Sequence, residues 1–228
     1  MNPADYATAW AHPPTHRAWL DHMATNIAGL IGWLAAWIGL LAVLVVFLSP
    51  GFAFLFIPFL LYSMYRAVLQ LRYFPAAFRM RRILQTYPWQ ILRGVPSGLT
   101  QHPEVLGRQY GWFELPNPAS PEQRLPLVFS QHLRTEWWSR RLAPRAKDEL
   151  KAQVEAVWFA GDPRFIGLIA APTPDGKAPR RLHVLQQQSR SEDGRSFADW
   201  GATPEDIERG RRVGIHPAQP DTRSEETP

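Results

Sequence analysis

Three groups of side chains in this chain of 228 residues have the types and spacing that chemistry needs. The first is a histidine pair: His12 and His16 are four residues apart, and on one helix face that spacing can hold a metal ion. Pro13 and Pro14 stand between them and disfavour a continuous helix. We therefore expect a solvated segment there, with no metal site and no cofactor.

The second group is Asp162 and Arg164, at the turn between two apolar runs. Asp162 precedes Pro163, a pair typical of turns, and its carboxylate can accept hydrogen bonds from nearby backbone donors. Loops on rigid scaffolds often carry sites, so these two residues form a candidate binding loop. The simpler interpretation, which we favour, is a β-hairpin turn with a polar tip.

The third group is Trp137 and Trp138, followed by Arg140 and Arg141. Aromatic and arginine side chains together can stack single-stranded nucleic acid or seat a domain at a membrane interface. Residues 94–188 carry 12 cations and 9 acids with no dense basic run, which argues against a nucleic-acid partner. We expect one tryptophan in the core and the other at its edge, where the pair is a candidate interface.

Familiar catalytic motifs are missing from the sequence: it has no glycine-rich phosphate loop, dinucleotide-binding fingerprint, zinc-protease helix or serine-hydrolase elbow. The lack of cysteine excludes a cysteine nucleophile, a thiolate metal site and disulfides. His102, His132 and His183 are dispersed among scattered acids, so an acid–base pair would have to form in three dimensions. An enzyme is therefore the alternative hypothesis and not the leading one.

The elements that must position these groups begin with two apolar runs. No Asp, Glu, Lys or Arg lies between Asp21 and Arg66. Residues 27–48 would span about 33 Å as a helix, enough to cross a hydrocarbon core of about 30 Å. After a proline–glycine break, residues 52–71 are long enough to cross if Arg66 reaches the headgroups. The sequence predicts a transmembrane helical hairpin over residues 27–71, with a re-entrant second segment as the alternative.

Positive charge predicts how this helical hairpin is oriented. Residues 66–93 contain six arginines and no acid, whereas the connection between the apolar runs has no cation. Cytoplasmic flanks carry the Lys/Arg excess, so we expect a plasma-membrane protein with both termini in the cytoplasm. Residues 1–26 form a cytoplasmic segment, and residues 72–87 form a basic juxtamembrane helix that contacts anionic lipid or is an ordinary topogenic flank. The candidate lipid contacts are Trp19, Arg66, Arg72, Arg79, Arg81 and Arg82.

Residues 88–188 predict a small β-rich domain. Short aromatic and branched runs separated by Gly and Pro are typical of strands and turns, and the repeated helical crossovers of a parallel sheet are missing. We expect an antiparallel sheet or a partly closed barrel, with one helix between the third and fourth strands. The predicted strands are 89–95, 108–115, 125–132, 154–160, 165–171 and 181–187.

Residues 189–228 form a polar tail with 6 cations and 9 acids, which we expect to be mostly disordered. One short helix from Pro204 to Arg212 is the exception, with Thr203 as its N-cap and Asp206 as the capping-box partner. The tail is then either a loosely tethered terminus or a docking motif that folds on a partner.

Together these features predict an α+β membrane protein that is not an enzyme. We expect it to present the β-rich domain at the cytoplasmic face and to scaffold or regulate a membrane complex. Its expected partners are anionic lipids and either a protein or a second copy of the chain, bound through small residues of the helical hairpin. Those residues are Gly29, Gly32, Ala36 and Gly39. The alternatives are a membrane-associated enzyme built from dispersed His and acid residues, and a small subunit of a transport or secretion assembly.

Overall fold

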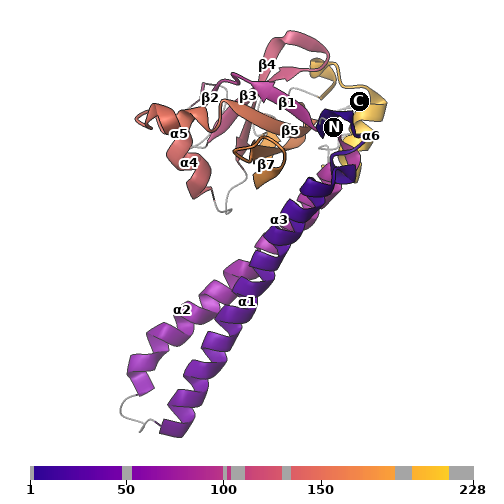
Figure 1. Cartoon of the computed structure of the whole chain (residues 1–228). Coiled ribbons are helices and arrows are strands. Elements are labelled where there is room, and N and C mark those ends of the chain that lie inside the picture. The colour runs from indigo at the N-terminus through magenta and orange to yellow at the C-terminus, as the bar shows by residue number, and fades with distance from the viewer. Residues whose placement is uncertain are drawn as a thin grey trace, which may run out of the picture.

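The fold is a long helical stalk that carries a β-rich domain at one end (Figure 1). The computed structural model of the chain describes residues 3–47, 53–99, 102–103, 111–129, 135–187 and 197–215. Two short 3-10 helices, η1 (Pro3–Asp5) and η2 (Ala9–Ala11), precede α1 (Pro13–Phe47), α2 (Ala53–Leu71) and α3 (Tyr73–Thr86). The predicted helical hairpin consists of α1 and α2, and α3 continues from α2 along α1 to the domain.

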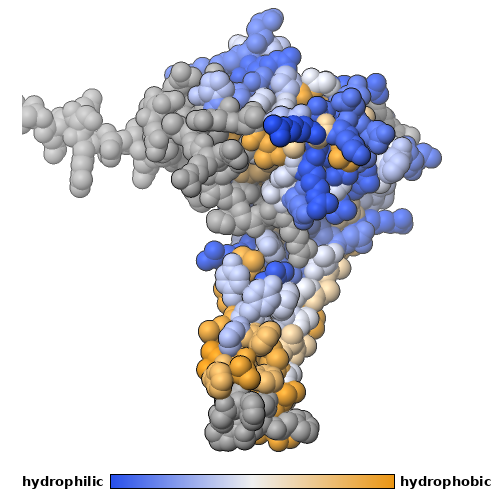
Figure 2. Space-filling view, turned by 90° about the vertical axis from the view of Figure 1, so that its left-hand side faces the viewer, coloured by the Kyte–Doolittle hydropathy of each residue, from blue (hydrophilic) through white to orange (hydrophobic). Residues whose placement is uncertain are grey.

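The helical hairpin exposes apolar side chains over most of its length. Val45 is 80% exposed, and Ile38 and Phe59 are each more than half exposed. Figure 2 shows this hydrophobic surface at the far end of the stalk, with polar surface where the stalk joins the domain. Both helices are long and apolar enough to cross a membrane, in line with the two predicted runs. The predicted turn between them lies outside the described residues.

The first helix begins at Pro13, well before the apolar run that starts at Ile27. Proline fits the first helical turn because the N–H that it lacks would have no partner there. Residues 13–26 are therefore helical, which corrects the prediction of an irregular, solvated segment. They pack against α3 and the sheet strand β7.

Seven strands form one antiparallel sheet that curls into a half-barrel, with the spatial order β1-β5-β6-β7-β4-β3-β2. The strands are β1 (Gln90–Arg93), β2 (Ser97–Gly98), β3 (Trp112–Asn117), β4 (Ser120–Phe129), β5 (Ala156–Asp162), β6 (Ile166–Pro172) and β7 (Pro179–Gln187). The predicted antiparallel sheet is confirmed; β2 is too short for alternation to reveal it. Parts of the predicted strands 108–115 and 125–132 lie outside the described residues. Two helices, α4 (Glu136–Leu142) and α5 (Asp148–Ala152), occupy the connection where one was predicted.

Apolar side chains cover both faces of the sheet. On one face, Met80 and Ile83 of α3 and Trp19 of α1 pack with Trp158. On the other face, Trp138 of α4 packs with side chains from β3, β4 and β5. Each large apolar side chain that is fully buried contributes about 1.5–3 kcal/mol. The stalk and the domain therefore share the first of these two hydrophobic clusters, and α3, the predicted juxtamembrane helix, contributes to it.

The segment of residues 197–215, part of the tail that we expected to be mostly disordered outside one short helix, packs on the domain. It consists of η4 (Phe197–Trp200) and α6 (Pro204–Arg212), and the bounds of α6 are those predicted. The predicted capping box is present: the Asp206 N–H donates to Thr203 Oγ1 (3.2 Å), and the Thr203 N–H donates to Asp206 Oδ2 (3.1 Å). Burial of Trp200 and Val213 in the two core clusters offsets the entropy of ordering this segment.

Candidate functional site at the junction of stalk and sheet

Trp19, predicted to contact lipid, lies inside the joint between α1 and α3. It is 6% exposed, and its Nε1–H donates to the carbonyl of Ala77 (2.9 Å). The Arg81 guanidinium stands over the rings of Trp10 and Trp19, 5.3 and 5.5 Å from their centroids. Because α1 starts early, Trp19 lies about 12 Å along the helix from Ile27 and is buried by the protein itself, and its contact with lipid stays a prediction.

The other predicted lipid contacts are Arg66, Arg72, Arg79 and Arg82. The Arg66 guanidinium stands over the ring of Trp33, 4.8 Å from its centroid. Arg72 and Arg82 are exposed, and Arg79 is half-buried. None of the four forms an ion pair with another described residue. Their contact with lipid stays a prediction.

The two neighbouring tryptophans of α4 divide between core and edge. Trp138 is 1% exposed, and its Nε1–H donates to the carbonyl of Arg181 (3.0 Å). Trp137 is half-buried, with the guanidinium of Arg141 at 3.7 Å and that of Arg180 at 5.7 Å from its ring centroid. Trp137 and Trp138 thus lie together beside Arg180 and Arg181 of β7.

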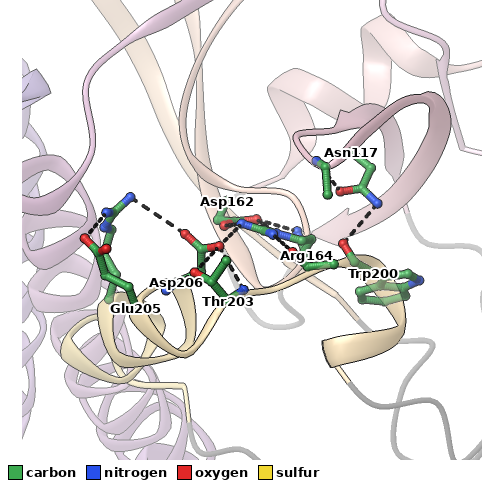
Figure 3. Close-up of polar contacts among 10 residues, drawn as sticks. Asn117, Asp162, Arg164, Trp200, Thr203, Glu205 and Asp206 are labelled. Atoms are coloured by element: carbon green, nitrogen blue, oxygen red, sulfur yellow. Dashed lines mark hydrogen bonds and ion pairs between the residues drawn. The ribbon is translucent and has the colours of Figure 1, made fainter.

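Asp162 and Arg164 form a buried ion cluster instead of an exposed loop tip (Figure 3). Arg164 donates to both carboxylate oxygens of Asp162, through Nε (2.9 Å) and Nη2 (2.6 Å). Its Nη2 also lies 2.9 Å from Asp206 Oδ2, and its Nη1 donates to the Gly201 carbonyl (2.9 Å). We call Asp162, Arg164 and Asp206 the C-terminal clasp, because it holds residues 197–215 against the β5–β6 turn.

The clasp leaves its charged groups paired. The hydrogen bond with Asp162 raises the pKa of Arg164 above its ordinary value. Burial acts to raise the pKa of Asp206, but hydrogen bonds from Thr203 and the charge of Arg164 outweigh it and hold this pKa below its ordinary value. A further hydrogen bond joins Asn117 Nδ2 to a carbonyl of η4 (3.3 Å). The charged groups of the clasp are therefore paired with one another, and the proposed role of Asp162 and Arg164 as a binding loop stays a prediction.

An acid–base site needs a histidine beside a carboxylate. Among the described residues, His102 has one: its Nε2 lies 2.9 Å from Glu114 Oε1. His183 is buried and has no carboxylate partner among the described residues, and His132 lies outside them. The described part of the chain contains no group of three His, Cys, Asp or Glu residues that could hold a metal ion. The geometry thus offers one His–carboxylate pair and no assembled catalytic centre in this part of the chain.

A cleft of about 700 Å³ lies where the stalk meets the sheet. Its walls are residues 14–26 of α1, Tyr73 and Met80 of α3, the tryptophans of α4 and the β6–β7 hairpin. We call it the junction cleft. Its charged lining consists of the cations Arg17, Lys177, Arg180 and Arg181 and the single acid Asp21.

The cations of the junction cleft have no acidic partners in the part of the chain that the structure describes. None of the four forms an ion pair with a described residue. Arg180 is held by a hydrogen bond from its Nε to the carbonyl of Pro172 (2.9 Å) and by its contact with Trp137. Its Nη groups have no partner among the described residues. The cleft is therefore a concave surface with excess positive charge, suited to an anion.

Two buried polar atoms on the cleft lining also lack partners. Asn26 is 1% and His183 3% exposed, and neither Asn26 Nδ2 nor His183 Nε2 makes a hydrogen bond with a described residue. Burial, with a smaller contribution from His22, lowers the pKa of His183 to about 3, so its imidazole is neutral. A neutral imidazole can carry its proton on Nε2 and donate it.

A bulge in β7 shapes the cleft. Arg181 and Leu182 together oppose Ala170 of β6, because the register shifts at this point. Arg181 has φ 56°, and among the described residues it alone combines a side chain with positive φ. Such a conformation costs on the order of 1–3 kcal/mol, and bulges re-aim side chains. Arg181, on this strained backbone, lines the cleft.

The cations of this cleft do not stand out in the sequence. Lys177, Arg180 and Arg181 are closely spaced in the hairpin connection before a strand, but one turn of basic residues is not specific. Arg17 and Asp21 are four residues apart on the helix that the prediction began too late. The recognisable feature would have been a helical face through residues 14–26 facing a basic hairpin.

No protein-family model matches this chain, and neither a curated protein nor a solved structure is significantly similar to it. Function must therefore be inferred from the geometry of the molecule itself.

Proposed function

We propose that the protein is a membrane-anchored, non-enzymatic module that holds its β-rich domain at the cytoplasmic face of the plasma membrane. There it would scaffold or regulate a membrane complex. The observation that carries this proposal is the continuity of α1, whose far end is apolar and exposed and whose first turns lie in the core of the domain. Such a helix fixes both the height and the orientation of the domain.

The orientation follows from charge. The arginines from Arg66 to Arg93 and the cations of the junction cleft lie at the end of the hairpin that joins the domain. Positive flanks face the cytoplasm, which supports a cytoplasmic domain and two cytoplasmic termini.

Cysteine labelling tests this orientation cleanly, because the chain has no cysteine of its own. In intact cells, a membrane-impermeant maleimide should label Ser49→Cys and leave Ser97→Cys unlabelled until the cells are opened. Labelling of Ser97→Cys from outside would overturn the proposal. Labelling of both only after lysis would show that the hairpin does not cross the membrane.

The hairpin also supports the proposed protein partner. Gly29 of α1 packs against α2 within the hairpin, since a Cβ there would meet the side chain of Gln70. Gly32 and Gly39 have open space around them, and Ala36 between them is exposed. Small residues on one helix face allow close approach of a second helix, from a partner or from a second copy.

A pull-down of full-length protein with its hairpin exchanged for an unrelated one separates the two contact modes. Partners that stay bound to the exchanged protein would be held by the β-rich domain, as the proposal requires for a scaffold. Loss of all partners would favour the alternative of a small subunit that assembles through its hairpin.

A further inference from the structure

We propose that the junction cleft binds the phosphate-bearing headgroup of an anionic membrane phospholipid. This inference rests on the proposed membrane anchorage and adds a specific ligand to it. The ligand class follows from three features of the cleft: its position, its unpaired cations and its unpartnered buried donors.

The position of the cleft matches the headgroup layer. On α1 its lining runs from Pro14 to Asn26, and the apolar run starts at the next residue, Ile27. On the returning helix, Tyr73 lines the cleft two residues after the end of α2. The bottom of the cleft therefore lies where both helices leave the apolar region, and the polar headgroup layer begins there.

The charge of the cleft matches a phosphate. Four cations and one acid line it, and none of the cations has an ion pair among the described residues. Arginine forks bind phosphate through parallel hydrogen bonds, and the free Nη groups of Arg180 and the exposed side chain of Arg181 are available for this.

The unpartnered donors are the independent observation. Buried polar atoms in folded proteins almost always have a partner, so each exception requires an explanation. Asn26 Nδ2 and His183 Nε2 are both such exceptions, and both residues line this one cleft. Phosphate and glycerol oxygens accept hydrogen bonds, so a bound headgroup would satisfy both. A free phosphate compound has the same chemistry, and the experiment must separate the two sources.

The test is native mass spectrometry of the full-length protein in neutral detergent, titrated with phosphatidylglycerol and with phosphatidylcholine. We expect tighter binding of phosphatidylglycerol. Lys177→Gln combined with Arg181→Gln removes two exposed cations whose side chains make no hydrogen bond within the described structure, so the fold should survive. At about 1 kcal/mol per cation, phosphatidylglycerol affinity should fall about 30-fold. The matched control, Arg124→Gln combined with Arg145→Gln, removes two exposed cations outside the cleft and should bind like the wild type.

Equal losses in the two double variants, or equal affinity for the two lipids, would overturn the proposal. Inorganic phosphate added as a competitor tests the source. Binding of inorganic phosphate that the cleft variant loses, without any preference for phosphatidylglycerol, would overturn the lipid as occupant. The lipid assay uses solubilised protein and the labelling assay uses intact cells, so neither result depends on the other. Loss of lipid binding would leave the proposed orientation standing, and a wrong orientation would leave the measured lipid binding standing.

A second variant tests the buried donor. Asn26→Leu keeps the number and branching of the side-chain heavy atoms and removes the unpartnered amide, so phosphatidylglycerol affinity should fall about tenfold while the lipid-free protein melts at the same or a higher temperature. A purely structural role for Asn26 would lower both affinity and melting temperature, and that result would overturn its assignment to the ligand.

Discussion

The C-terminal clasp and the junction cleft both contain polar and charged side chains. Those of the clasp are paired with one another, whereas several of those in the cleft have no partner among the described residues. In the clasp, Arg164 has two carboxylates and a carbonyl within 3 Å. In the cleft, Asn26 Nδ2 and His183 Nε2 have no partner among the described residues, and no ion pair joins the cations to a described acid. Burial of a polar group costs free energy unless a hydrogen bond compensates it. The chain completes the clasp with its own residues, which is why we infer a ligand for the cleft alone.

Breaking the clasp should have the largest effect on stability. Arg164→Met leaves Asp162 and Asp206 as like charges in a buried site, and loss of one partner from a buried pair costs about 3–5 kcal/mol. We expect the free energy of unfolding, measured by urea titration of the solubilised protein, to fall by this amount. The control Arg140→Met removes an exposed pair with Glu136 and should cost less than about 1 kcal/mol. Similar losses in the two variants would contradict a buried clasp.

As the pH falls, the stability contributed by His183 in the cleft should be lost at a higher pH than the stability contributed by Asp206 in the clasp. The pKa of His183 is about 3 in the folded protein and about 6.5 in an unfolded chain. The unfolded state therefore takes up the proton first, and the stability that this histidine contributes is lost as the pH falls from 6.5 toward 3. Between pH 7 and pH 5 the free energy of unfolding should fall by about 2 kcal/mol more in the wild type than in His183→Gln.

The clasp supplies the comparison for that experiment. The folded pKa of Asp206 is below its ordinary value of about 3.9, so its contribution to stability is complete above that pH and is lost only as the pH falls further. Asp206→Asn should therefore leave the change between pH 7 and pH 5 as in the wild type. If Asp206→Asn reduced the fall in the free energy of unfolding between pH 7 and pH 5, or if His183→Gln did not reduce it, the acid sensitivity would not come from the cleft.

Local patterns explain what the sequence could predict. An apolar run, strand alternation and the Thr203–Asp206 capping box each act within a few residues, and the two long helices, the antiparallel sheet and α6 are present as predicted. Whether a polar residue has a partner depends on distant parts of the chain. In sequence, Asp162 and Arg164 have the pattern of an exposed turn. They are buried because Asp206 pairs with Arg164, and Asp206 lies in a tail whose composition suggests disorder. The cleft likewise joins the start of α1 to β7, which no local pattern connects.

The smallest predicted effect concerns the bulge in β7, and it has the opposite sign to the effect at the clasp. Arg181→Gly removes the Cβ from a backbone position with φ 56°, so the free energy of unfolding should rise by about 0.5–1 kcal/mol, measured by urea titration. The same variant loses a guanidinium from the cleft, so its phosphatidylglycerol affinity should fall. Arg181→Gln is the matched control, because it loses the same charge and keeps the strained Cβ, and should therefore bind weakly without any gain in stability. Strain that lowers stability and supports binding is typical of a functional site. If Arg181→Gly instead destabilised the protein, the bulge would be a structural element like the clasp, and the contrast between the two regions would not hold.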